Sequence, residues 1–201
     1  MLNTRKSAFV DEMVVQGLTK AAAEKEMAVA LDRLVYYAGW CDKYVAVYSS
    51  VNSVASHTHN FSAPEDMGVV VIVAPEKTAL VGVVSAMCAA IAGGNTCVLL
   101  CSEKYPLCAL SFAEVIAVSD VPAGVVNILS GSKAELSKHL SEHLDVNAFV
   151  LCDTANVDAK QIETACAGNL KRFRYWQKDF LNAEVQGAEF IMDLQEIKTV
   201  W

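Results

Sequence analysis

Two oppositely charged side chains, Glu76 and Lys77, stand in the first turn after an apolar segment, where a nucleotide-binding fold holds its ligand. A carboxylate and an ammonium group at this place could form a binding or catalytic site. The turn has no glycine-rich sequence to cradle phosphates, however, and charged turn residues usually face solvent. We therefore expect Glu76 and Lys77 to be solvated.

Seven cysteines are spread along the chain without CxxC spacing, and most lie in apolar segments. Thiols of this kind are usually reduced and buried, as in cytosolic proteins. Cys101 and Cys108 fall near the expected ligand edge and could be redox-sensitive. No basic cluster or helix start around them favours a lowered pKa, so we expect both thiols to be buried and unreactive.

Two histidine pairs have spacings that could serve a metal ion or a helix face. His57 and His59 lie two residues apart on a presumed strand, but no further histidine or cysteine stands near them. Two ligands are too few for a zinc site, so we expect a solvated hairpin and no metal. His139 and His143, four residues apart, are expected on the exposed face of a helix.

Composition limits the classes of partner. The 201 residues suit one domain with at most a small appendage, and 54% of them are hydrophobic, with a mean hydropathy of +0.32. That excess fits buried strands and an oligomer interface. The net charge of −7 argues against nucleic acid or an anionic membrane as a partner. No signal peptide is evident and the apolar stretch Ala79–Gly94 is too short to span a membrane, so a cytoplasmic location is expected.

From Val69 onward, short apolar runs alternate with helical patterns. Strands are expected at Val69–Val73, Thr96–Leu100, Val125–Leu129, Asn147–Leu151 and Lys171–Tyr175. Helices are expected between them at Leu80–Ala92, Leu107–Val118, Ala134–Glu142 and Val157–Ala167. This alternation indicates an α/β fold with a parallel sheet covered on both faces. A ligand is then expected at the carboxyl ends of the strands.

The flanking segments have other patterns. Helices are expected at Thr4–Gln16 and Ala21–Lys43, separated near Gly17. Tyr44–Phe61 suits an exposed hairpin, because spaced valines are followed there by a polar run. Residues 195–201 alternate as a strand, which we expect to join this hairpin.

Three stretches together resemble the aldehyde dehydrogenase superfamily. Val29–Tyr44 (VALDRLVYYAGWCDKY) is similar to the helix before that family's cofactor domain. Ala89–Leu107 (AAIAGGNTCVLLCSEKYPL) is similar to its helix, strand and loop around the adenosine site. Gln195–Trp201 (QEIKTVW) is similar to its C-terminal oligomerisation strand, and shorter matches at 121–127 and 169–172 keep the same order.

The resemblance implies a Rossmann-like, doubly wound parallel sheet with N-terminal helices and a small antiparallel oligomerisation sheet. The implied units are N-terminal helices at 1–43, a hairpin at 44–64, an NAD-binding-type domain at 65–176, a linker at 177–194 and a terminal strand at 195–201. In the family a large catalytic domain precedes the terminal strand. Because only the linker occupies that place here, we expect the catalytic domain to be absent from these residues.

The family's chemistry, as implied by the resemblance, needs a cysteine thiolate, an Asn amide for the oxyanion, a Glu as general base and NAD as hydride acceptor. The family's Pro-Trp-Asn turn reads Pro75-Glu76-Lys77 here, and its general base falls near Trp176. None of the cysteines has the context of the nucleophile. No catalytic residue is therefore expected.

The implied cofactor contacts are also changed. Leu100 stands for the Lys that binds the adenosine ribose, and Cys152–Asp153 for the Gly-Ser that meets the diphosphate. We expect Asp153 to cap the following helix and to repel a diphosphate. Ser102 and Glu103 are the residual cofactor-binding residues, although Glu103 without its Lys partner is favoured as a solvated loop carboxylate over a ribose ligand. No cofactor is expected, with weak NAD binding as the alternative.

These substitutions favour a catalytically inactive, aldehyde dehydrogenase-like oligomerisation module, similar to the truncated second half of family-16 aldehyde dehydrogenases. It would dock on a second copy or on a complete aldehyde dehydrogenase domain through the hairpin and through Glu196, Ile197, Lys198, Thr199, Val200 and Trp201. A regulatory module that binds NAD(H) is the alternative, and an active dehydrogenase is disfavoured because no nucleophile is in context.

Overall fold

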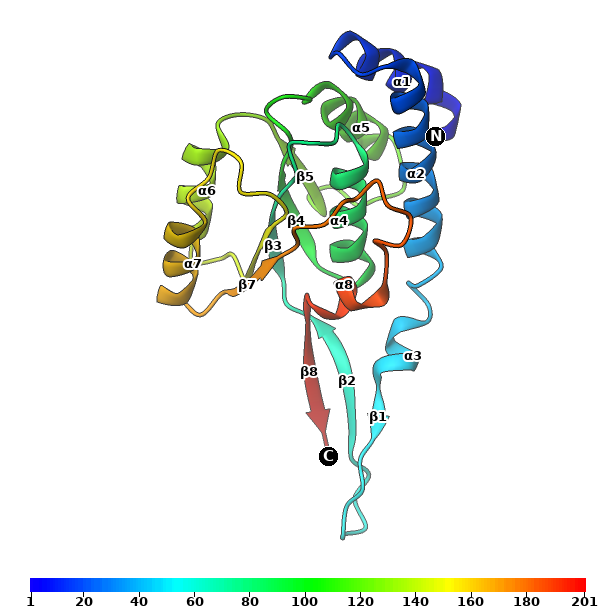
Figure 1. Cartoon of the computed structure of the whole chain (residues 1–201). Helices are drawn as coiled ribbons and strands as arrows, with labels where there is room; N and C mark the ends of the chain where they lie inside the picture. The colour runs from blue at the N-terminus through cyan, green and yellow to red at the C-terminus, as the bar shows by residue number, and fades with distance from the viewer.

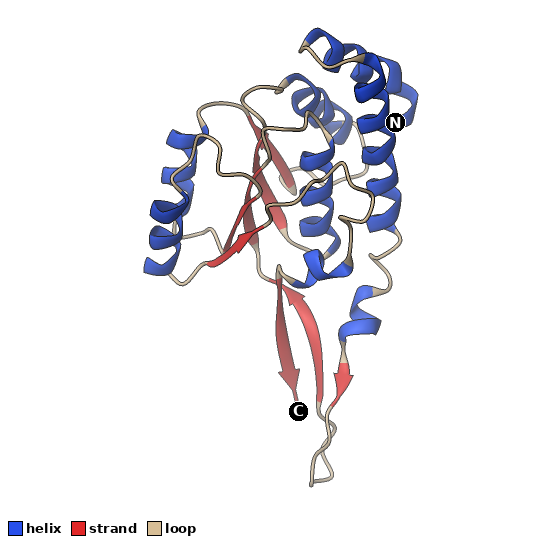
Figure 2. Cartoon of the chain, in the orientation of Figure 1, coloured by secondary structure: helices blue, strands red, loops and turns tan.

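A computed structural model describes all 201 residues and shows an α/β body from which a small antiparallel sheet extends. Both the N-terminal helices and the main sheet belong to the body, whereas the C-terminus lies in the extension (Figure 1). The strands, which are red in Figure 2, lie in two groups, one within the body and one in the extension. The expected α/β class with two sheets is confirmed.

The main sheet has five parallel strands in the order β5-β4-β3-β6-β7. The strands are β3 (Val69–Val73), β4 (Thr96–Leu100), β5 (Val126–Leu129), β6 (Ala148–Leu151) and β7 (Arg172–Tyr175). Four residues of β3 and all of β6 are buried, because helices cover both faces of the sheet. The chain leaves β3 toward β4 and β5 and then returns to β6 and β7, so the order reverses between β3 and β6. In folds of this kind, ligands bind where the order reverses.

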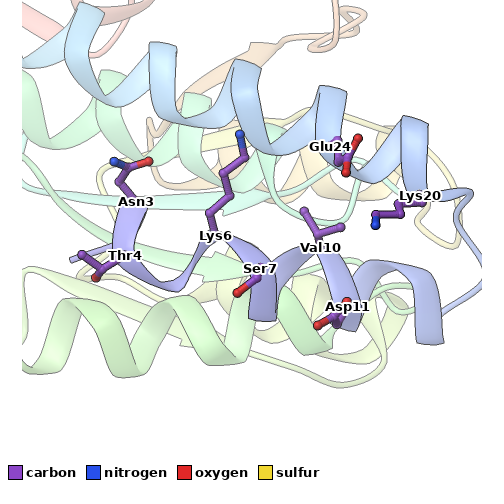
Figure 3. A pocket seen from close by; sticks show the side chains of 8 residues that line it. All are labelled: Asn3, Thr4, Lys6, Ser7, Val10, Asp11, Lys20 and Glu24. Carbon is purple, nitrogen blue, oxygen red and sulfur yellow. The ribbon is translucent and has the colours of Figure 1, made fainter.

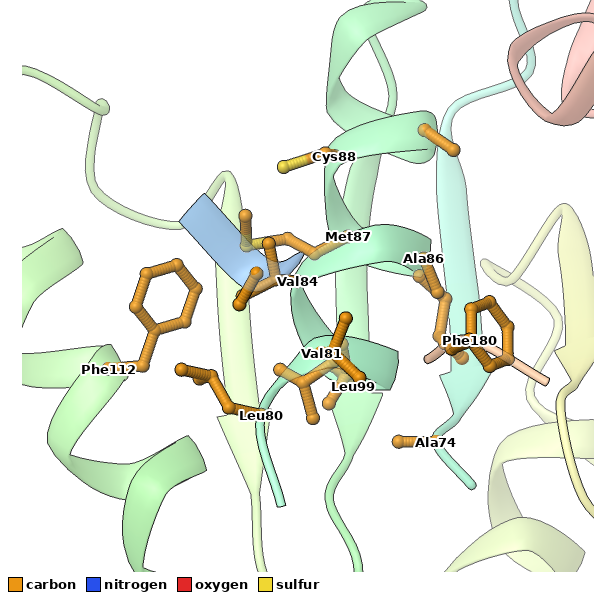
Figure 4. Packing of buried hydrophobic residues seen from close by; sticks show 14 of the residues in the cluster. Ala74, Leu80, Val81, Val84, Ala86, Met87, Cys88, Leu99, Phe112 and Phe180 are labelled. Carbon is orange, nitrogen blue, oxygen red and sulfur yellow. The ribbon is translucent and has the colours of Figure 1, made fainter. Parts of the chain in front are cut away.

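Helices cover the sheet in two layers that enclose separate cores. On one face lie α4 (Val81–Ala92) and α5 (Leu107–Ala117), and on the other lie α6 (Lys133–Glu142) and α7 (Ala159–Gly168). The larger core joins α4 to the sheet and to α5, where Val84, Met87 and Phe112 pack together (Figure 4). The smaller core lies under α6 and α7 and is formed by side chains on the opposite face of the strands. Each helix lies within two residues of its expected range.

The N-terminal segment forms a 3-10 turn (Asn3–Arg5) and two helices, α1 (Lys6–Val15) and α2 (Lys20–Ala38). Gly17 separates the helices with a φ of 102°, a conformation that favours glycine. Thr19 starts α2 by accepting a hydrogen bond from the N–H of Ala22. Helix α2 packs along α4, as Figure 1 shows, and ends five residues before the expected Lys43.

The segment expected as a hairpin begins with a helical turn, which corrects the expectation for its first residues. Tyr44–Tyr48 forms α3, with the Tyr44 side chain buried against the body. The hairpin itself joins β1 (Ser50–Val51) to β2 (Phe61–Asp66). Alternating valines predict a strand, but Tyr44 is buried in the larger core, and this tertiary contact outweighs the local preference.

The C-terminal strand β8 (Gln195–Val200) pairs antiparallel with β2 over its whole length, giving the sheet order β1-β2-β8. This pairing confirms the expected union of the terminal strand with the hairpin. Gln195 anchors the start of β8, because its side chain donates a hydrogen bond to the carbonyl of Gly93 at 2.9 Å. From there the strand runs away from the body (Figure 1).

The segment between β7 and β8 folds back over the body. It contains the short helix α8 (Ala188–Met192), and its buried side chains are Trp176, Phe180, Phe190, Ile191 and Leu194. Phe180 reaches the core beside Ala74 (Figure 4). The buried guanidinium of Arg33 donates to the carbonyl of Asn182 at 2.5 Å and fixes the segment to α2. None of the helices is long and apolar enough to cross a membrane.

Candidate functional site

The carboxyl edge of the parallel sheet is the first candidate site, because the strand order reverses there between β3 and β6. A cavity of about 540 Å³ opens at this point and is lined by the turn after β3, the end of β6 and the segment 177–181. A smaller cavity of about 340 Å³ lies beside Ser102 and Glu103, next to the start of α6. Both cavities are lined mainly by polar residues, unlike the apolar pockets that enclose most small ligands.

Glu76 and Lys133 form a buried ion pair at this edge. The Lys133 side chain is completely buried and that of Glu76 is 13% exposed. The Lys133 ammonium also donates to the carbonyl of Ala74 at 2.6 Å. The expectation that Glu76 is solvated is therefore wrong, whereas Lys77 is exposed as expected.

The Glu76 carboxylate accepts further hydrogen bonds from the loop after β4. Ser102 Oγ donates at 2.8 Å, and the N–H groups of Glu103 and Lys104 donate at 3.0 and 3.1 Å. With Lys133, these donors use the roughly four acceptor positions of a carboxylate. Glu76 thus joins the turn after β3, the loop after β4 and the start of α6.

Glu103 and Asp153 are also bonded within the protein. Glu103 accepts from the N–H of Lys133 at 2.5 Å and from the side-chain amide of Asn156 at 2.8 Å. Asp153 accepts from the N–H of Glu76 and from the N–H of Ala155, both at 3.0 Å. Glu103 is exposed, as a loop carboxylate was expected to be, but each of its oxygens accepts one hydrogen bond from within the protein.

Asp153 does not cap a helix, contrary to expectation. Helix α7 begins at Ala159, and its cap is Asp158, which accepts from the N–H of Gln161. Asp153 instead bridges the gap between the ends of β3 and β6 through its bond to Glu76. The reason is that the residues after β6 form a loop before the helix starts.

The first helix after β3 is capped by a carboxylate from another part of the chain. Glu26 on α2 is buried, and its Oε1 accepts from the N–H groups of Leu80 and Val81 at 2.7 and 3.0 Å. A helix start carries partial positive charge and free N–H groups, which make it an anion site in nucleotide-binding folds. Here the protein's own carboxylate occupies it.

Electrostatics at the edge favour ionised carboxylates. Burial alone would raise the pKa of Glu76, but the bonds from Lys133, Ser102 and Glu103 outweigh it and hold that pKa below its usual value. Burial alone would also raise the pKa of Asp153. Hydrogen bonds from the backbone N–H groups of Ala155 and Glu76 outweigh burial, so the pKa of Asp153 is lowered.

These lowered pKa values predict acid sensitivity. A carboxyl whose pKa is lower in the folded chain stabilises it above the unfolded pKa of about 4, and this stabilisation is lost as the pH falls through the folded pKa. The urea midpoint is therefore expected to fall between about pH 5 and pH 3. In the Glu76→Gln variant, the urea midpoint should fall less over the same pH range. An equal fall in the variant and the unmodified chain would contradict a role for Glu76 in the acid sensitivity.

The cysteines near this edge are not poised as nucleophiles. Burial raises the pKa of Cys101, and it raises the pKa of Cys152 to about 12. Burial also raises the pKa of Cys108, which lies in the larger core. The thiolate is the reactive form, so these thiols are inert at neutral pH.

The histidines do not gather into a metal site, and a further cavity lies away from the sheet edge. His57 and His59 lie in the exposed loop of the hairpin, and no three metal-ligating side chains gather anywhere in the structure. The N–H of Asp145 donates to the ring of His143 at the end of α6. A second cavity of about 540 Å³ lies between α1 and α2, where Lys6, Lys20 and Glu24 line it with small polar residues (Figure 3).

The free edge of β8 is the second candidate site. Asn52 donates from its N–H to the carbonyl of Asn60, so by alternation Ser62 and Pro64 turn their backbone groups toward the β1 side. The backbone groups of Ala63 on β2 then point toward β8, and those of its partner Lys198 point toward β2. It follows that Ile197 and Thr199 present their N–H and C=O groups to solvent.

Apolar side chains accompany this free edge. Ile197 is 57% exposed and Trp201 is 81% exposed, while Val51, Phe61 and Val200 are also exposed on the small sheet. Lys198 pairs with Glu65 at 3.0 Å across the two strands. An exposed strand with apolar side chains and unpaired backbone groups is a template for strand addition.

Comparison with known proteins identifies the family of the chain. The aldehyde dehydrogenase family matches residues 1–175. The chain belongs to the aldehyde dehydrogenase family. Human mitochondrial 10-formyltetrahydrofolate dehydrogenase is 30% identical over 172 residues, which are 85% of this chain and 18% of that protein. An aldehyde dehydrogenase of Aspergillus niger is 31% identical over 161 residues, 80% of this chain and 32% of the relative.

Solved aldehyde dehydrogenase structures share the fold. A putative aldehyde dehydrogenase from Burkholderia cenocepacia has a TM-score of 0.79 and 29% identity, covering 87% of this chain and 35% of the other. The structure of PnpE in complex with nicotinamide adenine dinucleotide has a TM-score of 0.79 and 26% identity, with the same coverage. The chain thus spans well under half the length of the relatives it matches.

The family's cofactor does not suit the residues present at the sheet edge. A dinucleotide brings a diphosphate that needs free N–H groups and positive charge. Here the N–H groups of Leu80, Glu103 and Ala155 already donate to protein carboxylates, and the ammonium of Lys133 is buried in its own pair. Added negative charge beside Asp153 would also be repelled.

The sequence indicates some of these residues and misses others. Ser102 and Glu103 do lie at the sheet edge as expected, but their side chains are used inside the protein. Lys133 was missed because a lysine in the first turn of a helix is usually exposed. The signal that could have found it is the fold itself, since α6 follows β5 and must start at the same edge as Glu76.

Proposed function

We propose that this chain is an assembly module of the aldehyde dehydrogenase family that performs no dehydrogenase chemistry of its own. The observation that carries the proposal is the free edge of β8, with outward backbone groups at Ile197 and Thr199 and exposed apolar neighbours. A water-soluble fold rarely leaves such an edge unprotected unless a partner covers it.

The charges on β8 favour a second copy as the partner. If two β8 strands pair antiparallel about a two-fold axis at Ile197, Glu196 of one copy stands opposite Lys198 of the other. Opposite charges directly across a strand pair stabilise it, whereas like charges destabilise it. A complete aldehyde dehydrogenase domain is the other partner that the same edge could accept.

The catalytic part of the proposal rests on the residues at the matched positions. Trp176, at the place of the general base, is buried, and its indole N–H donates to Asp193 at 2.9 Å. The buried cysteines have raised pKa values, and Glu76 stands in the turn that supplies the family's oxyanion amide. Neither a nucleophile nor a base is therefore available among these residues.

Deleting Glu196–Trp201 is expected to abolish self-association while the α/β body stays folded. The deletion must keep Gln195, because this side chain bonds to Gly93 and closes the end of the larger core. Sedimentation velocity measures the association, and far-ultraviolet circular dichroism checks the fold. A deleted chain that associates like the full one would refute the assembly proposal.

A further inference from the structure

We propose that the chain closes its own cofactor crevice, with the buried Lys133–Glu76 pair lying where a dinucleotide would cross the sheet edge, so that it binds neither NAD nor NADP. This inference does not depend on the assembly proposal, because the sheet edge and the free edge of β8 are separate surfaces. It rests on three features of the described contacts.

The first feature is the position of the pair between two cavities. Pro75 and Lys77, on either side of Glu76, line the cavity at the strand-order reversal. Ser102, which donates to Glu76, and Ser132, which precedes Lys133, line the smaller cavity. The pair thus lies between the two cavities, at the sheet edge where ligands bind in folds of this kind.

The second feature is the lack of free bonding capacity. Glu76 accepts from four donors, and both oxygens of Glu103 are occupied by Lys133 and Asn156. Glu76 therefore has no acceptor position left for a ribose hydroxyl, and Glu103 is already held by two hydrogen bonds within the protein. The helix start at Leu80 is likewise taken by Glu26.

The third feature is the free energy needed to separate the Lys133–Glu76 pair. Lys133 has no exposed side-chain surface, so a ligand can reach its ammonium only after the pair separates. Separating a buried pair leaves unpaired charges, which lowers the apparent affinity of any ligand by roughly a hundredfold or more. The pair also connects β3, the loop after β4 and α6, so the same separation would loosen the sheet edge.

Calorimetric titration of the 201-residue chain with NAD⁺, NADH and NADP⁺ tests closure directly. We expect no binding heat and no shift of the thermal midpoint up to millimolar ligand. Micromolar binding of any of the three would overturn the inference and would leave the assembly proposal standing. If the titration shows no binding and the chain does not self-associate, the assembly proposal is refuted and the closure of the crevice stands.

A double-mutant cycle tests whether the pair acts as a unit. Glu76→Gln and Lys133→Met are each expected to lower the folding equilibrium constant by roughly a hundredfold, because each leaves a buried charge unpaired. The double variant should be at least about tenfold more stable than the sum of the two effects predicts. Simple additivity would show that the two side chains are not coupled and would contradict the cost of separating them, on which closure of the crevice rests.

Lys138→Met is the matched control, since Lys138 lies exposed on the same helix. We expect this variant to unfold like the unmodified chain. If either single variant of the pair fails to fold, the titration of the unmodified chain still decides the question, because it needs no substitution.

Discussion

Proline at position 197 is expected to abolish self-association of the chain without unfolding its α/β body. The N–H of Ile197 points away from β2, so its removal costs no hydrogen bond within the small sheet. The same N–H would donate to an added strand, and proline removes that donor and places a ring against the partner backbone. We expect at least about a hundredfold weaker association, because strand addition depends on main-chain hydrogen bonds.

Ile197→Thr is the matched control, because it keeps the N–H and the β-branched shape while reducing the apolar surface. This variant is expected to lose less than about tenfold in affinity. Sedimentation equilibrium of both variants measures the difference. Equal association by the proline and threonine variants would show that the edge of β8 is not the contact.

Replacement of Glu26 by alanine is expected to lower the free energy of unfolding by about 3 kcal/mol. The substitution removes the single acceptor of two buried N–H groups, those of Leu80 and Val81, at the start of α4. No other side chain caps this helix, which packs between α2 and the sheet. Two unpaired buried donors account for the size of the effect.

The Glu26→Gln variant separates the hydrogen bonds from the charge. Both N–H groups donate to the same oxygen of Glu26, so a glutamine carbonyl can accept them and only the attraction to the helix dipole is lost. This loss should be about 1 kcal/mol. Urea unfolding of both variants measures whether the alanine variant loses more stability than the glutamine variant. Replacement of the exposed Glu24 by alanine is the control. An alanine variant within about 0.5 kcal/mol of the unmodified chain would contradict the capping role.

Much of the fold follows from patterns along the chain. The run at Val69–Val73 is apolar at every position, which is the requirement of a strand covered on both faces. The alternation at residues 195–200 predicts a strand, and β8 does pair with β2 there, although every residue after Gln195 is exposed. Strands of this kind can be predicted from the residue pattern of the segment alone, without knowledge of distant residues.

The details of the sheet edge depend on contacts between distant residues and were not predictable from local patterns along the chain. Glu26 and Leu80 meet only because α2 lies along α4, and Lys133 meets Glu76 only because α6 begins beside β3. Asp153 was expected to cap a helix that begins six residues later. Charged residues in turns are usually solvated, so a buried pair such as Glu76 and Lys133 cannot be recognised from its position in the sequence.

Sedimentation equilibrium of the full chain over a range of concentrations tests the central claim most directly. A protein whose free β8 edge pairs with a second copy should increase in mass with concentration, from 21.7 kDa toward twice that value. The proposal predicts this transition in the micromolar range, and its loss in the Ile197→Pro variant. A constant mass of one chain up to several hundred micromolar would contradict self-assembly through β8.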